Sequence, residues 1–144
     1  MKRLTTILSC LITLIFIINV YAFEQQSVNE FLGKWKYETD NYSFIIEINS
    51  ISNNSIDATY SIAADAGKQI DVPFEDENNI EFKEYNNSEN SLKLIFISKF
   101  DLAVYKATLT KTANNKIQFT LGEAIKEGAH LFPWKAPREL IKFE

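Results

Sequence analysis

The chain has 144 residues, of which 46% are hydrophobic, 13% aromatic and 24% charged, and its formal net charge is −4. This composition excludes a disordered chain, a collagen-like repeat and a basic nucleic-acid-binding protein. No acidic residue precedes Glu24, so residues 23–144 carry 13 basic and 19 acidic side chains, a net charge of −6.

The first 22 residues have the parts of a secretory signal peptide. A basic start, Met1-Lys2-Arg3, precedes an apolar run over residues 4–21, and Val20-Tyr21-Ala22 supplies the small-x-small pattern of a cleavage site. We therefore predict cleavage after Ala22 and export. The abundance of Asn, Ile and Lys is typical of an AT-rich bacterial genome, so the expected location is the periplasm or the medium. The alternative is an uncleaved leader that anchors the protein in the membrane.

Cys10 is the only cysteine and leaves with the predicted leader. The mature protein is then expected to contain no disulfide, so its own core must stabilise the fold.

Residues 23–144 are predicted to form one all-β domain. After one helical turn near residues 27–32, short segments alternate apolar and polar side chains with the period of two that is typical of strands. Turns rich in Asn and Ser separate them at residues 52–55, 86–90 and 113–115. The predicted inward-facing residues are Phe44, Ile46 and Ile48; Ile56, Ala58, Tyr60 and Ile62; Ile80 and Phe82; Leu92, Leu94 and Phe96; Ala103, Tyr105, Ala107 and Leu109; and Ile117, Phe119 and Leu121.

About eight strands joined by tight turns predict an antiparallel meander, and closure into a barrel would remove its exposed edges. Residues 92–97 are apolar on both faces, which indicates a strand that is covered on its outer side as well.

The segment Phe31-Leu32-Gly33-Lys34-Trp35 resembles the opening of calycin barrels, the group of lipocalins, fatty-acid-binding proteins and avidins. The segment from Asp57 to Ala63, with Tyr60-Ser61-Ile62-Ala63 at its end, is similar to the end of an avidin second strand. The resemblance implies a calycin-like barrel in which Trp35 plugs one end and a basic residue near the last strand lies over it. Arg138 is the expected basic residue. The avidin pattern of polar ligands for biotin is not present, because Tyr37 and Ile62 stand where avidins have Asn and Ser.

Few residues suit catalysis or metal binding. His130 is the single histidine and no nucleophile turn accompanies it. Zinc needs several His or Cys ligands, and the run Glu75-Asp76-Glu77 lacks the alternating spacing and the Gly turn of a calcium loop. We therefore predict neither enzymatic activity, nor a metal site, nor a cofactor.

The sequence instead favours binding to another protein, as an inhibitor or immunity-type protein does. Phe132, Trp134 and Lys135 lie in a segment stiffened by two prolines, and rigid aromatic side chains are good interface anchors. The alternative is that this segment folds over one end of the barrel and buries Trp134 in the core. Lys68 and Asp71 are the expected neighbours of these residues if the two loops lie at the same end of the barrel. The net negative charge would favour a basic partner protein such as a hydrolase or toxin. It would repel nucleic acid, so no nucleic-acid partner is expected. The alternative function is a carrier of a small hydrophobic ligand inside the barrel.

Overall fold

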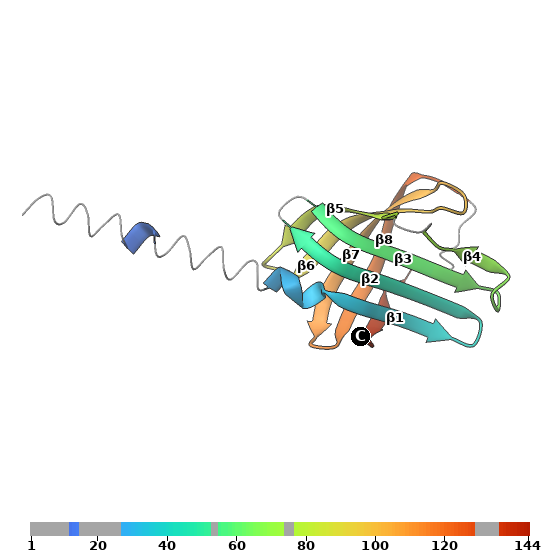
Figure 1. Cartoon of the computed structure of the whole chain (residues 1–144), viewed down its shortest axis with the longest axis horizontal. Coiled ribbons are helices and arrows are strands. Elements are labelled where there is room, and N and C mark those ends of the chain that lie inside the picture. The colour runs from blue at the N-terminus through green and yellow to red at the C-terminus, as the bar shows by residue number, and fades with distance from the viewer. Residues whose placement is uncertain (1–11, 15–26, 53–54, 74–76, 129–135) are drawn as a thin grey trace, which may run out of the picture.

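The computed structural model describes residues 12–14, 27–52, 55–73, 77–128 and 136–144. Its strands follow a short 3-10 turn, η1, at Asn29–Phe31 and form one antiparallel sheet in the order β4-β3-β2-β1-β9-β8-β7-β6-β5 (Figure 1). The strands are β1 (Gly33–Thr39), β2 (Tyr42–Ser52), β3 (Ser55–Ala64), β4 (Gln69–Asp71), β5 (Ile80–Asn86), β6 (Ser91–Ile97), β7 (Val104–Ala113), β8 (Lys116–Lys126) and β9 (Arg138–Lys142). None of the helices in the described ranges is long and apolar enough to cross a membrane.

The predicted all-β antiparallel class is confirmed, and so is most of the inward face. Alternate residues of β2 and β3 are buried, and residues directly opposite each other in the ladder point the same way, as in the pairs Phe44↔Ile62 and Ile46↔Tyr60. Among the predicted inward residues, Phe82 and Leu121 are only partly buried and pack on the rim of the core.

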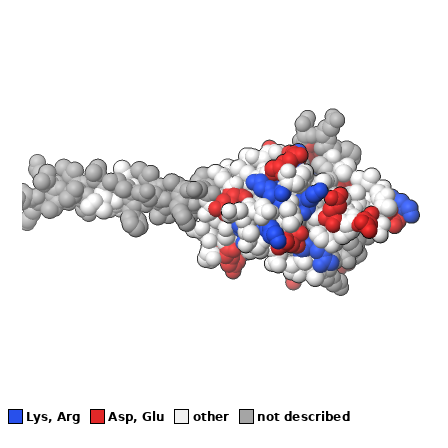
Figure 2. Space-filling view, turned by 90° about the horizontal axis from the view of Figure 1, so that it is seen from below, with Lys and Arg blue, Asp and Glu red and all other residues white. Residues whose placement is uncertain are grey.

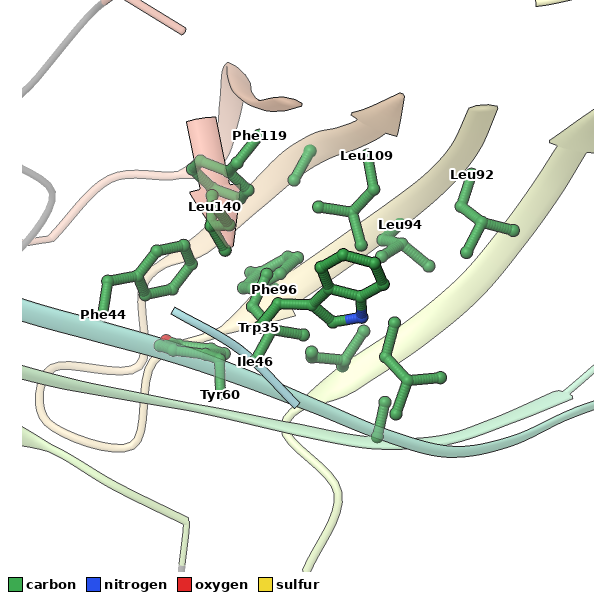
Figure 3. Close-up of a cluster of buried hydrophobic side chains, with 14 of the residues drawn as sticks. Trp35, Phe44, Ile46, Tyr60, Leu92, Leu94, Phe96, Leu109, Phe119 and Leu140 are labelled. Atoms are coloured by element: carbon green, nitrogen blue, oxygen red, sulfur yellow. The ribbon is translucent and has the colours of Figure 1, made fainter. Parts of the chain in front are cut away.

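Aromatic rings fill the middle of the curved sheet. The ring of Phe44 lies 4.8 Å from that of Phe119, and the ring of Tyr60 lies 4.8 Å from that of Phe96. Phe96 and Phe119 join these two pairs at 5.5 Å. The four rings come from β2, β3, β6 and β8 and point toward one another together with Trp35 and Leu140 (Figure 3). Ring pairs at these separations stabilise the core beyond their buried area.

The prediction of a closed barrel is wrong. In the described residues, β4 and β5 are the two edges of the sheet and no strand ladder joins them. The reason is that β4 has only three residues and pairs with the last part of β3, from Ile62 to Ala64. Next to the first part of β3, residues 77–79, which lead into β5, form no strand. Two asparagine side chains of this segment, Asn78 and Asn79, bond to the backbone of β3 instead.

Asn79 takes the place of a strand at this gap, which we call the β3–β5 seam. Its amide oxygen accepts a hydrogen bond from Tyr60 N–H at 2.7 Å, and its amide nitrogen donates to Tyr60 C=O at 2.8 Å. The neighbouring Asn78 donates to Ile56 C=O at 3.3 Å. Because the Asn79 backbone carbonyl also accepts from Ile97 N–H, this buried residue ties β3 to β6 across the seam.

On the outward face of β6, which was predicted to be covered, Ser91 and Ile95 are buried, and Ile95 is the apolar one of the two. Its ladder neighbours are Glu81 on β5 and Lys106 on β7. Long charged side chains cover apolar surface with their aliphatic stems, so these two neighbours explain the burial without an additional element.

Replacing Asn79 tests the β3–β5 seam. Asn79→Ala would leave both backbone groups of Tyr60 without these partners in a buried position, and we expect it to lower the free energy of unfolding by about 2–4 kcal/mol. Asn78→Ala, which removes one longer bond, should cost less than about 1 kcal/mol. Urea unfolding of the two variants measures the difference, and equal stabilities would contradict the role assigned to Asn79.

Candidate functional site

Trp35 lies fully buried on β1, and its indole N–H donates to Phe31 C=O at 2.8 Å. The cations over its ring are Lys111 of β7, with Nζ 4.8 Å from the ring centroid, and Lys142 of β9, at 5.3 Å. Arg138, the predicted lid, lies instead over Tyr37, with its guanidinium carbon 5.7 Å from the ring centroid. The sheet explains this difference, because Trp35 pairs with Lys142 whereas Arg138 begins β9 and pairs with Phe119.

Lys111 also fastens this end of the molecule. Its ammonium group donates to Glu30 C=O at 3.0 Å and to Asn114 C=O at 2.9 Å, which joins η1 to the β7–β8 turn. Burial lowers the pKa of Lys111. Both bonds lie within the protein itself, so Lys111 holds η1 and the β7–β8 turn together beside Trp35.

The predicted partner-binding residues divide into three groups. Phe132, Trp134 and Lys135 lie outside the described residues. Lys68 lies on the exposed β3–β4 turn, where its side chain is 77% exposed and its ammonium is 3.6 Å from the Asp65 carboxylate. Asp71 is only 1% exposed, so its prediction as a contact residue is wrong.

Asp71 is buried because the alternation of β4 turns its side chain inward, where its carboxylate serves the neighbouring loop. One carboxylate oxygen accepts from the backbone N–H of Lys99 at 2.9 Å and of Phe100 at 3.2 Å. The other accepts from the Tyr60 hydroxyl at 2.8 Å. Burial, and then the charge of Asp71, raise the pKa of Tyr60 and of Tyr42 far above the usual value. Both phenols therefore stay protonated in the folded protein, and Tyr60 remains a donor to Asp71.

The loop that Asp71 holds, residues 98–103 between β6 and β7, has every backbone N–H bonded. Besides the two bonds to Asp71, Asp101 N–H donates to the Ser98 hydroxyl at 3.2 Å and Ala103 N–H donates to the Asp101 carboxylate at 3.0 Å. Two backbone bonds, Ser98 N–H to Ala103 C=O and Leu102 N–H to Ser98 C=O, complete the set. A loop with these bonds is rigid.

The chain just after β8 packs against the same loop, at Gly128. A Cβ atom added at Gly128 would collide with the Asp101 carboxylate and with Ala103, so only a glycine permits this approach. The loop is thus fixed from β4 on one side and from the chain after β8 on the other.

This fixed loop presents two large apolar side chains to solvent. Phe100 is 54% exposed and Leu102 is 60% exposed. Leu102 also has a φ of 60°, in the left-handed region that a bulky residue rarely adopts. Strain of this kind persists only where surrounding structure imposes it, and it clusters at functional sites.

Two more exposed apolar residues flank Asp71 itself, Ile70 and Val72. The bonds from Lys99 and Phe100 N–H to Asp71 join the two segments. Ile70 alternates with Asp71 along β4 and therefore lies on the opposite face of the strand from that carboxylate.

Sequence reasoning missed this loop. One signal for it was available in the sequence. Ser98 and Asp101 are three residues apart, a spacing at which a Ser or Asp side chain can accept a hydrogen bond from the backbone of a turn. Nothing in the residues 98–103 themselves indicates that their N–H donors are satisfied by a carboxylate 28 positions earlier in the chain.

Comparison of the chain with protein-family models, curated proteins and solved structures finds no match. The calycin resemblance therefore stays an interpretation of the sequence. Within the described ranges, no group of three or more His, Cys, Asp or Glu side chains is placed to hold a metal ion.

The role assigned to Asp71 predicts a large structural effect of its removal. Asp71→Ala would leave two loop N–H groups and the Tyr60 hydroxyl without their acceptor, and we expect a loss of at least about 3 kcal/mol in the free energy of unfolding. Lys68→Ala, three positions earlier on the exposed turn, should change it by less than about 0.5 kcal/mol. Chemical denaturation distinguishes these cases. If Asp71→Ala were as stable as Lys68→Ala, the carboxylate would not hold the loop.

The strain at Leu102 is measurable by comparing two truncations. Leu102→Ala and Leu102→Gly remove the same exposed side chain, but only glycine adopts a positive φ without a steric cost. We expect the free energy of unfolding of the glycine variant to exceed that of the alanine variant by about 1 kcal/mol. This difference is smaller than the full cost of the left-handed conformation for alanine, because glycine loses more backbone entropy on folding. A glycine variant that is less stable would show that the backbone is relaxed at this position.

Proposed function

We propose that the mature protein, residues 23–144, is an exported, non-enzymatic binding protein of the inhibitor or immunity type that acts by attaching to another protein. The observation that carries this proposal is the 98–103 loop, which holds Phe100 and Leu102 in solvent on a fully hydrogen-bonded, strained backbone. Fixing a loop in one conformation before binding removes part of the entropic cost of association.

The packed aromatic side chains inside the curved sheet favour this binding function over that of a carrier for a small hydrophobic ligand. The rings of Phe44, Tyr60, Phe96 and Phe119 occupy the space between the curved strands, with adjacent centroids 4.8–6.4 Å apart. A hydrophobic ligand would have to displace these packed side chains, which costs the contacts that stabilise the core.

The experiment is affinity capture with a matched pair of variants. The protein is produced from its full sequence, so that an expression host processes it, and is then immobilised beside Phe100→Ala and Phe143→Ala. Phe143 is also exposed, but it follows the end of β9, which pairs with the start of β8, whereas the residue after the 98–103 loop, Val104, pairs with Lys126 at the end of β8. Each form is incubated with an envelope extract of the source organism, and any retained protein is identified and assayed for activity with and without the binder.

We expect the wild-type protein and Phe143→Ala to retain the same partner and to reduce its activity. Phe100→Ala should lose at least about 2 kcal/mol of binding energy, which is roughly thirtyfold in affinity, with an almost unchanged melting temperature because its side chain is half exposed. Tight binding of a fluorescent fatty acid, with no protein retained, would replace this proposal by the carrier.

A further inference from the structure

Three Asn-x-Ser tripeptides occur in the chain, and this is the acceptor pattern of N-linked glycosylation in exported proteins. They begin at Asn41, Asn53 and Asn86. Bacterial transferases require in addition an acidic residue two positions before the asparagine. Glu84 stands at that position before Asn86, whereas an uncharged residue stands there before each of the other two. The complete pattern therefore occurs once, in the segment Glu84-Tyr85-Asn86-Asn87-Ser88.

The Asn86 tripeptide lies on the hairpin turn that joins β5 to β6. β5 is an edge strand of the described sheet, and Asn86 forms with Ser91 the last pair of the ladder before the turn. Asn87 and Ser88 are exposed, and Asn86 is partly exposed. An enzyme therefore reaches this tripeptide without opening the sheet.

The side chain of Asn86 is held by the serine of its own tripeptide. Its amide oxygen accepts hydrogen bonds from the Ser88 hydroxyl at 2.8 Å, from Ser88 N–H at 3.1 Å and from Glu89 N–H at 3.3 Å. All three bonds end on the oxygen, and none of them uses the nitrogen Nδ2, the atom to which a glycan is attached. Because this turn is formed before an enzyme binds, less entropy is lost when the enzyme binds it.

The Asn41 tripeptide lies in a different setting. Tyr42 is buried in the core, and Ser43 lies within β2, which pairs with β1 on one side and with β3 on the other. This tripeptide would have to leave the sheet to enter the site of an enzyme. Asn53 lies outside the described residues. The structure thus distinguishes an accessible tripeptide at Asn86 from an inaccessible one at Asn41.

The charged side chains near the turn do not prevent access to Glu84. Acidic and basic side chains lie close to one another on this molecule, and on the face that Figure 2 shows they are interspersed. Glu84 follows the same pattern, because its carboxylate pairs with the Lys93 ammonium at 3.0 Å and both side chains are about half exposed. An exposed pair of this kind contributes little stability, so Glu84 is easily released to a basic group of an enzyme.

We propose that Asn86 is the acceptor of an N-linked glycan that is attached to the folded protein after export, the same export that the proposed function requires. Nδ2 of Asn86 attacks the anomeric carbon of the first sugar of a polyprenyl-diphosphate-linked oligosaccharide. The bond between Nδ2 and this carbon forms, the bond from the carbon to the diphosphate oxygen breaks, and the polyprenyl diphosphate leaves as an anion. An oligosaccharyltransferase of the cell envelope takes up the amide proton that is lost.

A glycan at this turn is compatible with partner binding at the 98–103 loop. β6 runs from Ser91, next to the turn, to Ile97, next to the loop, so the two sites lie at opposite ends of a strand about 23 Å long. A glycan is bulky and hydrophilic. It would cover the end of the edge strand β5, where another chain could otherwise pair, and leave Phe100 and Leu102 open.

Glycosylation of the folded protein in vitro tests the proposal. The processed protein is produced in a host without an oligosaccharyltransferase and is incubated with a purified bacterial oligosaccharyltransferase and a polyprenyl-diphosphate-linked oligosaccharide. Intact-mass spectrometry measures the mass that is gained, and tandem spectrometry of peptides locates it. The variants are Glu84→Gln, Asn86→Gln, Ser88→Ala and Ser88→Thr, with Asn41→Gln as the matched control. Circular dichroism confirms that each is folded.

We expect the wild-type protein, Ser88→Thr and Asn41→Gln each to gain the mass of one glycan, located at Asn86. Asn86→Gln should gain none, because the acceptor amide is displaced by one methylene. Ser88→Ala and Glu84→Gln should gain none although Asn86 is still present. These two variants separate recognition of the full pattern from simple exposure of the amide.

The proposal is overturned if the wild-type protein gains no mass, or if the glycan is found on Asn41 or Asn53 in place of Asn86. Modification of Ser88→Ala at the wild-type rate would also contradict it, because the reaction would then not depend on the pattern. Each of these failures leaves the proposed function intact, since affinity capture tests partner binding separately. Loss of partner capture would in turn leave a glycan at Asn86 unexplained by that function but still present.

Discussion

A single buried carboxylate, that of Asp71, determines how the open end of this sheet is built. Its two oxygens accept hydrogen bonds from a strand side chain, Tyr60, and from two backbone N–H groups of the β6–β7 loop. A buried charge is tolerated only where its hydrogen-bonding capacity is met, and bonds from backbone N–H groups to a carboxylate are among the stronger ones. The short strand β4 therefore contributes to the fold mainly by carrying this group to the loop.

The β3–β5 seam and the Asp71 loop solve the same problem by different means. A curved antiparallel sheet that stops short of closure leaves buried backbone groups along its edges, and these require partners. At the seam the partners are the amides of Asn78 and Asn79, and at the loop they are Asp71, Ser98 and Asp101. Side chains thus replace a missing strand ladder, and the loop that results is rigid enough to display Phe100 and Leu102 without a cover.

The alternation of apolar residues made most of the fold predictable, because a sheet with one buried face imposes a period of two on its sequence. The inward positions of β2, β3, β6 and the first half of β8 follow from this rule. The burial of Trp35, in contrast, was implied only by the calycin resemblance of the segment around Gly33. Asp71 was expected to contact a partner only because its loop and the 132–135 segment could share one end of the molecule. Its burial depends on donors that come from distant residues, and no local pattern encodes them. The left-handed conformation of Leu102 is likewise imposed by the tertiary bonds of the loop, and leucine itself gives no sign of it.

The central claim is that Asp71 fixes the 98–103 loop before any partner binds. Amide hydrogen exchange of the isolated protein tests it directly, residue by residue. The account predicts that the N–H groups of Lys99 and Phe100 exchange slowly, at rates comparable with the paired amides of β3. Rapid exchange of both, at the rate expected for an unfolded chain, would contradict it, because the loop would then be mobile and Phe100 and Leu102 would not be held ready for binding.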